Sequence, residues 1–321
     1  MTPSMFILEY NALIILVLLV AVSSFMSPIF LSWNNVVNVL RQQSSYLIIA
    51  MGMLMCLLTG GIDLSVASTV GFGSIMITQL VVNNDMAIIP AILITLALCA
   101  VIGMINGSLV AYLNMAPFIV TLAMDFGIRG VVYIISRGMN IMLSPKDSDP
   151  LLQSFMNFGQ GGDPLIGIPW KVYLTVVIVL IFWFVLRYTS FGRLITATGS
   201  NPVAVTLAGI NIKKYRFSVY VICSFLGGLA GVLTTASNGA SSPNTATGDY
   251  AMTAIAGTIL GGADLAGGKG SAGFTVMGVF IFGLISNILN LSNVPAYPQL
   301  CVKAVVIILA IFMRSVINKN K

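Results

Sequence analysis

The chain has 321 residues, of which 58% are hydrophobic and only 7% are charged, and its mean hydropathy is +1.00. A soluble domain carries about 25% charged residues, because its surface has to face water. This composition therefore excludes a soluble globular protein and indicates a chain whose surface mostly faces lipid. The absence of histidine and the presence of a single glutamate, Glu9, also argue against most metal sites and most general acid–base catalysis.

The net charge of +6 and the isoelectric point near 9.2 do not indicate a nucleic-acid partner. The basic residues gather in loops between apolar runs, which is the distribution that the positive-inside rule produces. The four cysteines stand singly in apolar segments, without the spacing of a disulfide framework or a metal site. We therefore expect buried thiols and no cofactor bound by the chain itself. These cysteines are Cys56, Cys99, Cys223 and Cys301.

Apolar segments follow one another from end to end, and no block of domain size looks soluble. A bilayer core of about 30 Å takes roughly 20 helical residues, and this length predicts about ten spans in a single transmembrane domain, residues 1–321. The eighth segment is too short to cross as an ordinary helix and is predicted to be either a half-helix or a helix that ends abruptly. The first lacks the flanks of a signal peptide, so we expect it to be retained. The predicted spans are residues 11–27, 35–58, 64–82, 86–113, 116–136, 170–187, 216–238, 250–262, 273–292 and 298–316.

The charges in the loops predict the orientation of the chain. The loop 187–216 carries five basic residues and no acidic one, which places it in the cytoplasm. The C-terminal tail, four spans further on, is basic too, with Arg314, Lys319 and Lys321. The longest loop, residues 137–170, has three aspartates against two basic residues and falls on the external side. Counting the spans back from it places the N-terminus inside, so both termini are expected to be cytoplasmic.

The first candidate site is the sequence TGGIDLS, residues 59–65, between the second and third predicted spans. Paired glycines end a helix readily, and Asp63 is a suitable N-cap for the helix that follows. One interpretation is a capped turn that has no role in transport. The other is that Asp63 and Ser65 line a substrate pathway, because an ionisable residue at membrane depth is costly and broken helices are tolerated there when they line a cavity.

Further polar residues lie inside the predicted spans. Asp125 and Arg129 are four residues apart, on one helical face, so each charge offsets part of the burial cost of the other. They form either a structural pair or a pair that lines the pathway. Asn106 and Asn287 either bond between helices or face a solvated path that carries a hydroxylated cargo. The same alternatives hold for Gln42, Gln43, Ser44 and Asn290.

The predicted cytoplasmic loop contains a short helix. Asn201 is its N-cap, Pro202 is its first residue, and Gly209 lies just past its end. The helix itself is almost uncharged, although basic residues flank it. A short apolar helix on this side of the membrane either docks into the groove of a partner or lies among lipid headgroups.

The segment GGADLAGGKG, residues 261–270, is similar to a phosphate-binding loop but fails its pattern. Gly270 stands where Ser or Thr is required, and no strand precedes the segment. We therefore expect no nucleotide site here, and a flexible connection after a truncated helix instead. Glycine pairs at four-residue spacing predict close helix packing; they are Gly103/Gly107, Gly227/Gly231 and Gly257/Gly261.

Several segments together resemble a known family. GGIDLSVAS, MAPFIVTLAM followed by RG, FGRLITATGSNPVAVTLAGI, GGADLAGGKG and YPQLCVKAVVIILA are similar to the ribose-type permeases of bacterial ABC sugar importers. The similarity covers essentially the whole chain, in order, and one departure is Ala67, where the family usually has glycine. It implies an all-α polytopic protein of the bacterial cytoplasmic (inner) membrane, with the permease fold of type II ABC importers.

By the same resemblance the chain is a transporter subunit without an ATPase site of its own, and it translocates ribose or a related sugar. Two permeases, identical or paralogous, would sit in the bilayer above two ATP-binding ABC subunits that use ATP and Mg, and a sugar-binding protein would deliver the cargo. The residues that couple the permease to the ATPase would be Gly192, Arg193, Asn201, Pro202, Ala204 and Gly209.

Two rival classes differ from this interpretation. A secondary transporter driven by protons or sodium would have Asp63 and Asp125 as its plausible coupling residues. A membrane-embedded enzyme is disfavoured, because the sequence offers no histidine and no clustered carboxylates from which to assemble a nucleophile–base set.

Overall fold

The computed structural model describes residues 11–143, 149–295, 297–306 and 308, and these residues are mostly helical. Two short strands, β1 (Ile141–Met142) and β2 (Ala240–Ser241), pair antiparallel with Ile141 opposite Ser241. The α-helices are α2 (Asn11–Met26), α3 (Trp33–Leu58), α4 (Val66–Thr78), α5 (Ile88–Ala111), α6 (Pro117–Ser136), α7 (Pro150–Gln160), α8 (Trp170–Tyr188), α9 (Ser190–Ser200), α10 (Pro202–Leu207), α11 (Ile212–Asn238), α12 (Tyr250–Leu260) and α13 (Ala272–Leu291). A π-helix, η1 (Gln79–Asn83), continues α4, and a 3₁₀ helix, η2 (Pro243–Thr247), precedes α12.

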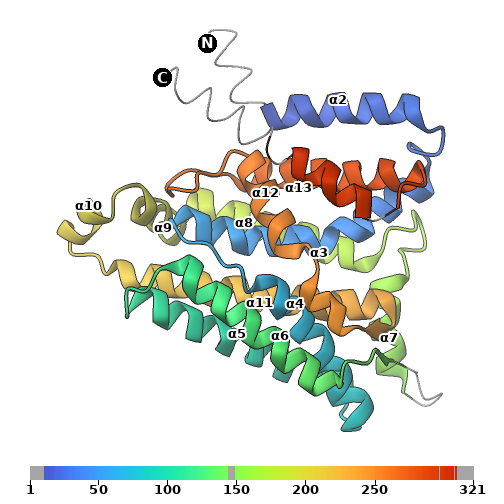
Figure 1. The fold of residues 1–321 in the computed structure, drawn as a ribbon, viewed down its shortest axis with the longest axis horizontal. Coiled ribbons are helices and arrows are strands. Elements are labelled where there is room, and N and C mark those ends of the chain that lie inside the picture. Colours follow the sequence, from blue (N-terminus) through green and yellow to red (C-terminus); the bar gives the residue numbers. More distant parts are fainter. Residues whose placement is uncertain (1–10, 144–148, 296, 307, 309–321) are drawn as a thin grey trace.

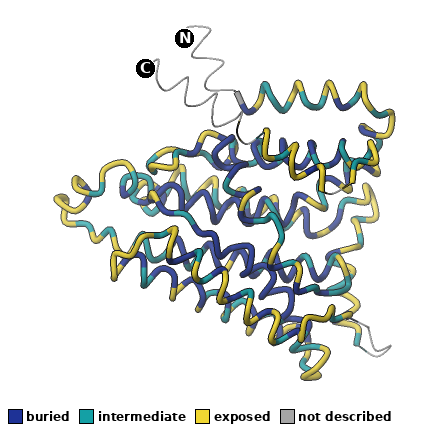
Figure 2. The backbone as a smooth tube through the Cα atoms, in the orientation of Figure 1, coloured by how far each residue is buried: buried dark blue, intermediate teal, exposed yellow. Residues whose placement is uncertain are grey.

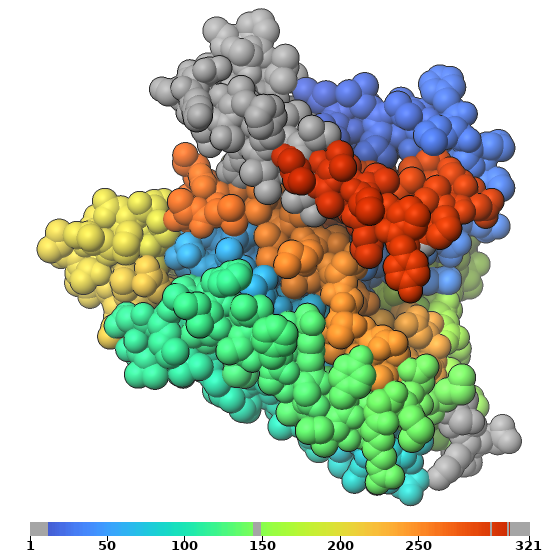
Figure 3. All heavy atoms as spheres, in the orientation of Figure 1, coloured from blue at the N-terminus to red at the C-terminus, as the bar shows by residue number. Residues whose placement is uncertain are grey.

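Most of the long helices lie along the long axis of the molecule, with α9 and α10 at one end and α7 near the other (Figure 1). The loop predicted to be cytoplasmic and the loop predicted to be external therefore lie at opposite ends. The space-filling view shows the same arrangement, with the segment around α10 projecting from one end (Figure 3).

Six helical stretches are long and apolar enough to cross a membrane, and each coincides with a predicted span. They are Val66–Asn83, Ile88–Ala111, Pro117–Ser136, Trp170–Tyr188, Ile212–Asn238 and Ala272–Leu291. The 26-residue α3 is not among them, and its first half is polar, whereas the apolar α2 is shorter. The total of about ten spans therefore stays a prediction. The tenth lies partly outside the described residues, as do Glu9, Lys146, Asp147 and the basic C-terminal tail.

The eighth predicted span is α12, and its 11 residues confirm that it is a half-helix. At a rise of 1.5 Å per residue it covers only about half of a bilayer core. The preceding segment runs inward from β2 through η2, so α12 begins inside the helix bundle instead of at its end (Figure 1).

The core is built around α3, α4 and α11. Every residue of α3 from Leu47 to Leu58 is buried, and the tube view shows this buried trace at the centre of the molecule (Figure 2). Close packing depends on glycine: a Cβ at Gly231 of α11 would collide with the Val70 carbonyl of α4, and one at Gly103 of α5 would lie 2.6 Å from the Tyr220 carbonyl oxygen of α11. The glycine-spaced pairs therefore do pack closely, as the sequence predicts.

The structure corrects two of the expectations drawn from sequence. Cys301 is exposed, and only Cys56, Cys99 and Cys223 are buried thiols. The N-cap of α4 is Ser65, and Asp63 lies two residues before it, where its carboxylate accepts from the Ser65 amide. The loops predicted to be external and cytoplasmic also hold helices, α7 and α9, which hydropathy alone does not indicate because both are too short and too polar to be identified as spans.

Candidate functional site

Asp63, Ser65 and Asn106 form a hydrogen-bonded group at the turn between α3 and α4. The Asp63 Oδ1 atom accepts from the Ser65 amide at 3.0 Å and from the Ser65 hydroxyl at 2.6 Å. The Asn106 amide of α5 donates to that hydroxyl at 2.8 Å. All three side chains are fully buried. The group thus ties the α3–α4 turn to α5.

The same group also carries unsatisfied polar atoms. Asp63 Oδ2 and Asn106 Oδ1 are buried without a hydrogen-bond partner among the described residues. Such an atom costs about 1–3 kcal/mol. The sequence analysis left a capping role and a pathway role open for Asp63; the contacts support a role in ordering the turn, and the pathway role stays a prediction.

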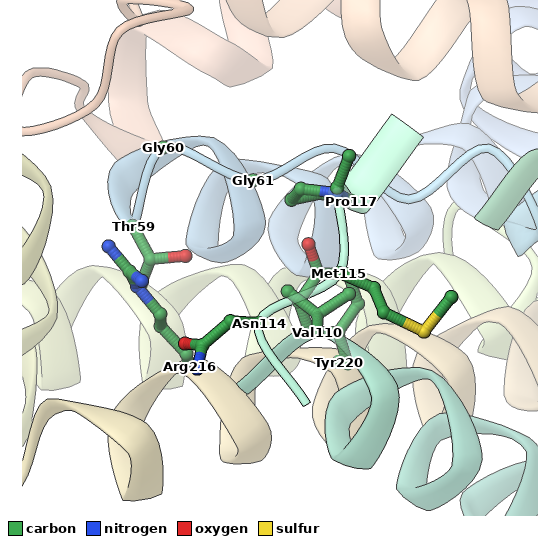
Figure 4. Close-up of a pocket in the computed structure, with 10 residues that line it drawn as sticks. Thr59, Gly60, Gly61, Val110, Asn114, Met115, Pro117, Arg216 and Tyr220 are labelled. Atoms are coloured by element: carbon green, nitrogen blue, oxygen red, sulfur yellow. The ribbon is translucent and has the colours of Figure 1, made fainter. Parts of the chain in front are cut away.

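A cavity of about 240 Å³ opens beside this turn, at the end of the molecule that carries α9 and α10. The close-up shows Arg216 and Asn114 beside Thr59 and the paired glycines of the turn (Figure 4). Asp63, Ser65 and Asn106 are not among its lining residues. The further lining residues are Val110, Met115, Ala116, Pro117 and Tyr220.

The Asp125–Arg129 pair lies on α6, and Asp125 is close enough to the start of α4 to interact with Ser68 and with Asp63. Arg129 Nη2 is 2.7 Å from Asp125 Oδ2, so the predicted i, i+4 pair forms. The Asp125 side chain is buried against α4, whereas the Arg129 side chain is 33% exposed. Whether the pair also lines a pathway stays a prediction.

Asn287 forms a third, separate contact. Its amide of α13 exchanges two hydrogen bonds with the amide of Asn35 on α3, at 3.0 and 2.8 Å. Asn35 also donates to the Phe30 carbonyl at 2.8 Å. The five residues predicted for the pathway therefore divide between two places in the fold. Asp63, Ser65 and Asn106 are hydrogen-bonded to one another, with Asp125 nearby against the start of α4, whereas Asn287 lies apart.

The structure adds one cluster that the sequence analysis missed. Lys303 Nζ lies 2.6 Å from Asp249 Oδ2, and the Tyr46 hydroxyl donates to Asp249 Oδ1 at 2.8 Å. The signal was the polar run SSPNTATGD, residues 241–249, directly before the half-helix, together with Lys303 inside the tenth predicted span. Neither could be paired without knowledge of which helices are neighbours.

The predicted coupling residues lie on α9 and α10. The Thr189 side chain accepts from the Gly192 amide at 3.2 Å, and a Cβ at Gly192 would collide with the Val185 carbonyl, so α9 folds back tightly on α8. The Arg193 guanidinium donates to the Tyr188 carbonyl at 3.2 Å.

The predicted short helix is confirmed as α10. The Asn201 side chain caps it by accepting from the Ala204 amide at 3.0 Å, and Pro202 is its first residue. Gly209 follows its end with φ of +77°, a conformation that glycine adopts readily. Val203 is 67% exposed and Leu207 is 83% exposed, so α10 presents an apolar face that no described residue covers.

The loop predicted to be external is ordered around Asp163. This carboxylate accepts from the Leu165 amide at 2.7 Å and from the Tyr173 hydroxyl at 2.8 Å. These two bonds, the amide bond first, lower the pKa of Asp163 from its ordinary value. In the described part of the chain, no three His, Cys, Asp or Glu side chains are grouped so that they could hold a metal ion.

The six long apolar helices, with polar groups bonded between helices of the bundle, define a multi-pass membrane protein. A family model described as the permease component of the branched-chain amino acid transport system matches residues 35–311. The chain is 38% identical over 307 residues to the ribose import permease of Escherichia coli (strain K12), covering 96% of this chain and 94% of that protein.

Other relatives agree with this assignment. The ribose import permease of Bacillus subtilis (strain 168) is 36% identical over 298 residues, 93% of this chain and 90% of the relative. The D-allose transport system permease of E. coli (strain K12) is 33% identical over 312 residues, 97% and 93%. No solved structure matches the chain. The chain therefore belongs to this permease family, as a ribose-type permease of the sugar ABC importers and a multi-pass protein of the inner membrane.

Proposed function

We propose that the chain is the membrane-spanning subunit of an ATP-driven importer that moves a monosaccharide, ribose or a related sugar, into the cytoplasm. Its relatives named for ribose, allose and galactose import support this class of cargo. A separate ABC subunit would bind ATP and Mg and hydrolyse the nucleotide, a sugar-binding protein would deliver the cargo, and a second permease would complete the pathway. Both termini would lie in the cytoplasm.

The uncovered apolar face of α10 is the observation that best supports the proposal of an ATPase partner. Leu207 and Val203 are more than half exposed on a helix that has basic residues on both sides. A free apolar face in water is unfavourable at about 25 cal/mol per Å². An amphipathic helix satisfies such a face by lying in a hydrophobic groove of a partner, and a groove on the ATPase subunit would provide that contact.

The packing of α9 supports a mechanical role for this end of the chain. A Cβ at Gly199, near the end of α9, would collide with the Leu58 carbonyl at the end of α3. The Gly268 amide donates to the same carbonyl at 2.9 Å. A displacement of α9 and α10 by the ATPase would therefore press directly on the α3–α4 turn that contains Asp63.

Substitutions in and after α10 test the ATPase contact. Ala204→Glu places a charge on the exposed face, and Gly209→Pro demands a φ near −65° where the chain has +77°. Gly209→Asn is the matched control, because Asn tolerates the left-handed conformation. We expect both disruptive variants to insert into the membrane, while co-purification of the ATPase or ATP-driven uptake falls at least tenfold.

The control should retain the ATPase and the uptake. Normal co-purification and uptake by both Ala204→Glu and Gly209→Pro would remove α10 as the coupling helix. Uptake that needs no ATPase and stops with an ionophore would instead favour a secondary transporter.

A further inference from the structure

A charged and aromatic cluster lies where α12 begins, and the proposed coupling to the ATPase does not involve it. Asp249 holds Lys303 at 2.6 Å and accepts from the Tyr46 hydroxyl at 2.8 Å. The ring of Tyr46 stacks on that of Tyr250, with the centroids 4.9 Å apart and the planes at 28°. These four residues are named the Tyr46–Lys303 cluster below.

The cluster lies midway along α3, between the two ends of the bundle that the proposed orientation places on opposite sides of the membrane. Tyr46 is close to the midpoint of α3, which is about 39 Å long at 1.5 Å per residue. One end of α3 contacts the external loop, because the Trp33 indole donates to the Ile166 carbonyl at 2.8 Å. At the other end, the Leu58 carbonyl accepts from the Gly268 amide. Each end of α3 is thus anchored to a loop on a different side, and Tyr46 is between them.

At this depth the charged pair is only partly covered by the chain. The Asp249 side chain is 29% exposed and the Lys303 side chain is 19% exposed. Charged groups that face hydrocarbon at the bilayer centre cost several kcal/mol, and they are found facing the bundle interior or a water-filled cavity. The open side of the cluster therefore faces a solvated space or another polar surface.

The exposed face of α3 leads to the same space. Asn34, Asn38 and Gln42 are exposed and follow one another at four-residue spacing, with Tyr46 as the next member. A helix that faces lipid exposes apolar side chains, as α8 does. The exposed side chains of α8 include Val176, Val177, Leu180, Ile181 and Phe184. The contrast indicates that the amide face of α3 is turned away from lipid.

The amide face begins at an open groove on the external side. Asn34, Asn38 and Arg41 line a hollow of about 740 Å³ between α3 and the external loop. From this hollow, Gln42 is one helical turn further along α3 and Tyr46 is two turns further. Polar groups therefore form a continuous line from the external surface to the cluster.

We propose that the Tyr46–Lys303 cluster is a binding site for the monosaccharide cargo in the outer half of the pathway, an inference that rests on the proposed function. A sugar hydroxyl both donates and accepts, so it can donate to the Asp249 carboxylate and accept from the Lys303 ammonium. The aromatic pair offers an apolar surface to the C–H face of a sugar ring. Gln42 adds an amide that can both donate and accept.

The charges of the cluster select against other ligands. Asp249 and Lys303 together are neutral, so the site has no net attraction for an anion or a cation. An anion would be repelled by the carboxylate, and a coupling cation would have to displace the ammonium group. A neutral polyhydroxylated ligand needs neither change.

Cysteine labelling tests whether the face is solvated. In the assembled complex, with the exposed Cys301 replaced by Ser, Gln42→Cys should react with a membrane-impermeant methanethiosulfonate reagent added from outside. Leu180→Cys on α8 is the control, because that side chain is 55% exposed but apolar neighbours surround it. We expect at least tenfold faster labelling of Gln42→Cys, slowed by a sugar that the complex transports and not by one that it leaves outside.

Uptake by tyrosine variants tests the contact with cargo. Tyr46→Phe removes a hydroxyl that donates to an aspartate at 2.8 Å, and Tyr173→Phe removes the same bond at the same distance from Asp163 in the external loop. With D-ribose, D-allose, D-galactose and D-fructose as probes, Tyr46→Phe should lower ATP-driven uptake about tenfold and change the ranking of the sugars, as expected when one hydrogen bond to a charged group is lost. Tyr173→Phe should leave both unchanged.

The outcomes separate this inference from the proposed function. Absence of ATP-driven uptake of any sugar by the unaltered complex would contradict the proposed function. If the unaltered complex takes up sugar normally, two results would overturn the cargo site while leaving the proposed function intact. One is a Gln42→Cys variant that does not react with the reagent. The other is a Tyr46→Phe variant that matches Tyr173→Phe in uptake rate and in the ranking of the sugars.

Discussion

The amide pair of Asn35 and Asn287 allows a quantitative test of how polar groups hold this bundle together. The two side chains exchange hydrogen bonds at 3.0 and 2.8 Å between α3 and α13, and both are more than 90% buried. Interhelical hydrogen bonds in membranes contribute about 0.6–2 kcal/mol each. Asn287→Leu removes two such bonds, so we expect it to lower the free energy of unfolding by about 1–4 kcal/mol.

A double-mutant cycle isolates the interaction. Asn287→Leu leaves the Asn35 side-chain amide with only its bond to the Phe30 carbonyl. Asn35→Leu leaves the Asn287 side chain without either of the two bonds that it forms with Asn35. The double variant leaves neither amide stranded, so the coupling energy should be about 1–2 kcal/mol in favour of the pair. Thermal unfolding of the purified permease in detergent, followed by tryptophan fluorescence, gives the three differences.

The cycle also distinguishes the two interpretations that the sequence leaves open for Asn287. If the amide only joins the helices, the double variant should transport sugar at a rate close to that of the unaltered complex. A coupling energy near zero, together with loss of uptake in all three variants at unchanged stability, would refute the structural interpretation and support a role in the pathway.

Three further predictions concern orientation, the Asp63 turn and the external loop. Leu165→Cys and Leu207→Cys, which replace side chains 91% and 83% exposed, should be labelled from outside and from inside respectively, and labelling of both from the same side would overturn the topology. Asp63→Asn keeps the Oδ1 acceptor and should transport nearly normally, whereas Asp63→Ala should lower the stability by about 1 kcal/mol; strongly impaired uptake by a well-folded Asp63→Asn would support the pathway role instead. Because folding lowers the pKa of Asp163, its contribution to loop stability is present above its unfolded value of about 3.9 and is lost as the pH falls through the lower folded value. Hydrogen exchange at the Leu165 amide, corrected for the intrinsic rate, should rise in that window, and Asp163→Asn should weaken the protection already at pH 7; equal protection in the variant would contradict this role.

Six of the spans and the caps of α10 were predictable because they depend on local sequence. Length and hydropathy locate α5, α6, α8, α11 and α13 within a few residues, since a bilayer fixes how many apolar residues a helix needs. The N-cap Asn201 and the positive φ of Gly209 are equally local, and both agree with the structure. The half-helix α12 was predictable because its apolar segment is shorter than a bilayer span requires.

The site depended on contacts that no local pattern carries. Asp249 and Lys303 are 54 residues apart, and Asn35 and Asn287 are 252 apart. Which face of a membrane helix points inward is also weakly encoded, because apolar residues suit both lipid and core. The three-residue group around Asp63 was recognised as residues of interest, but the contact of Asn106 with Ser65 follows only from the packing of α5 against the turn.

Reconstitution of the transport cycle tests the central claim most directly. The permease, its ATPase subunit and the sugar-binding protein would be placed in proteoliposomes, and uptake of labelled D-ribose and related monosaccharides would be followed with ATP and Mg on the cytoplasmic side. We predict uptake that requires ATP hydrolysis, the binding protein and an intact α10 face, and that persists when an ionophore collapses the ion gradients. Uptake by the permease alone that an ionophore abolishes would contradict the assignment.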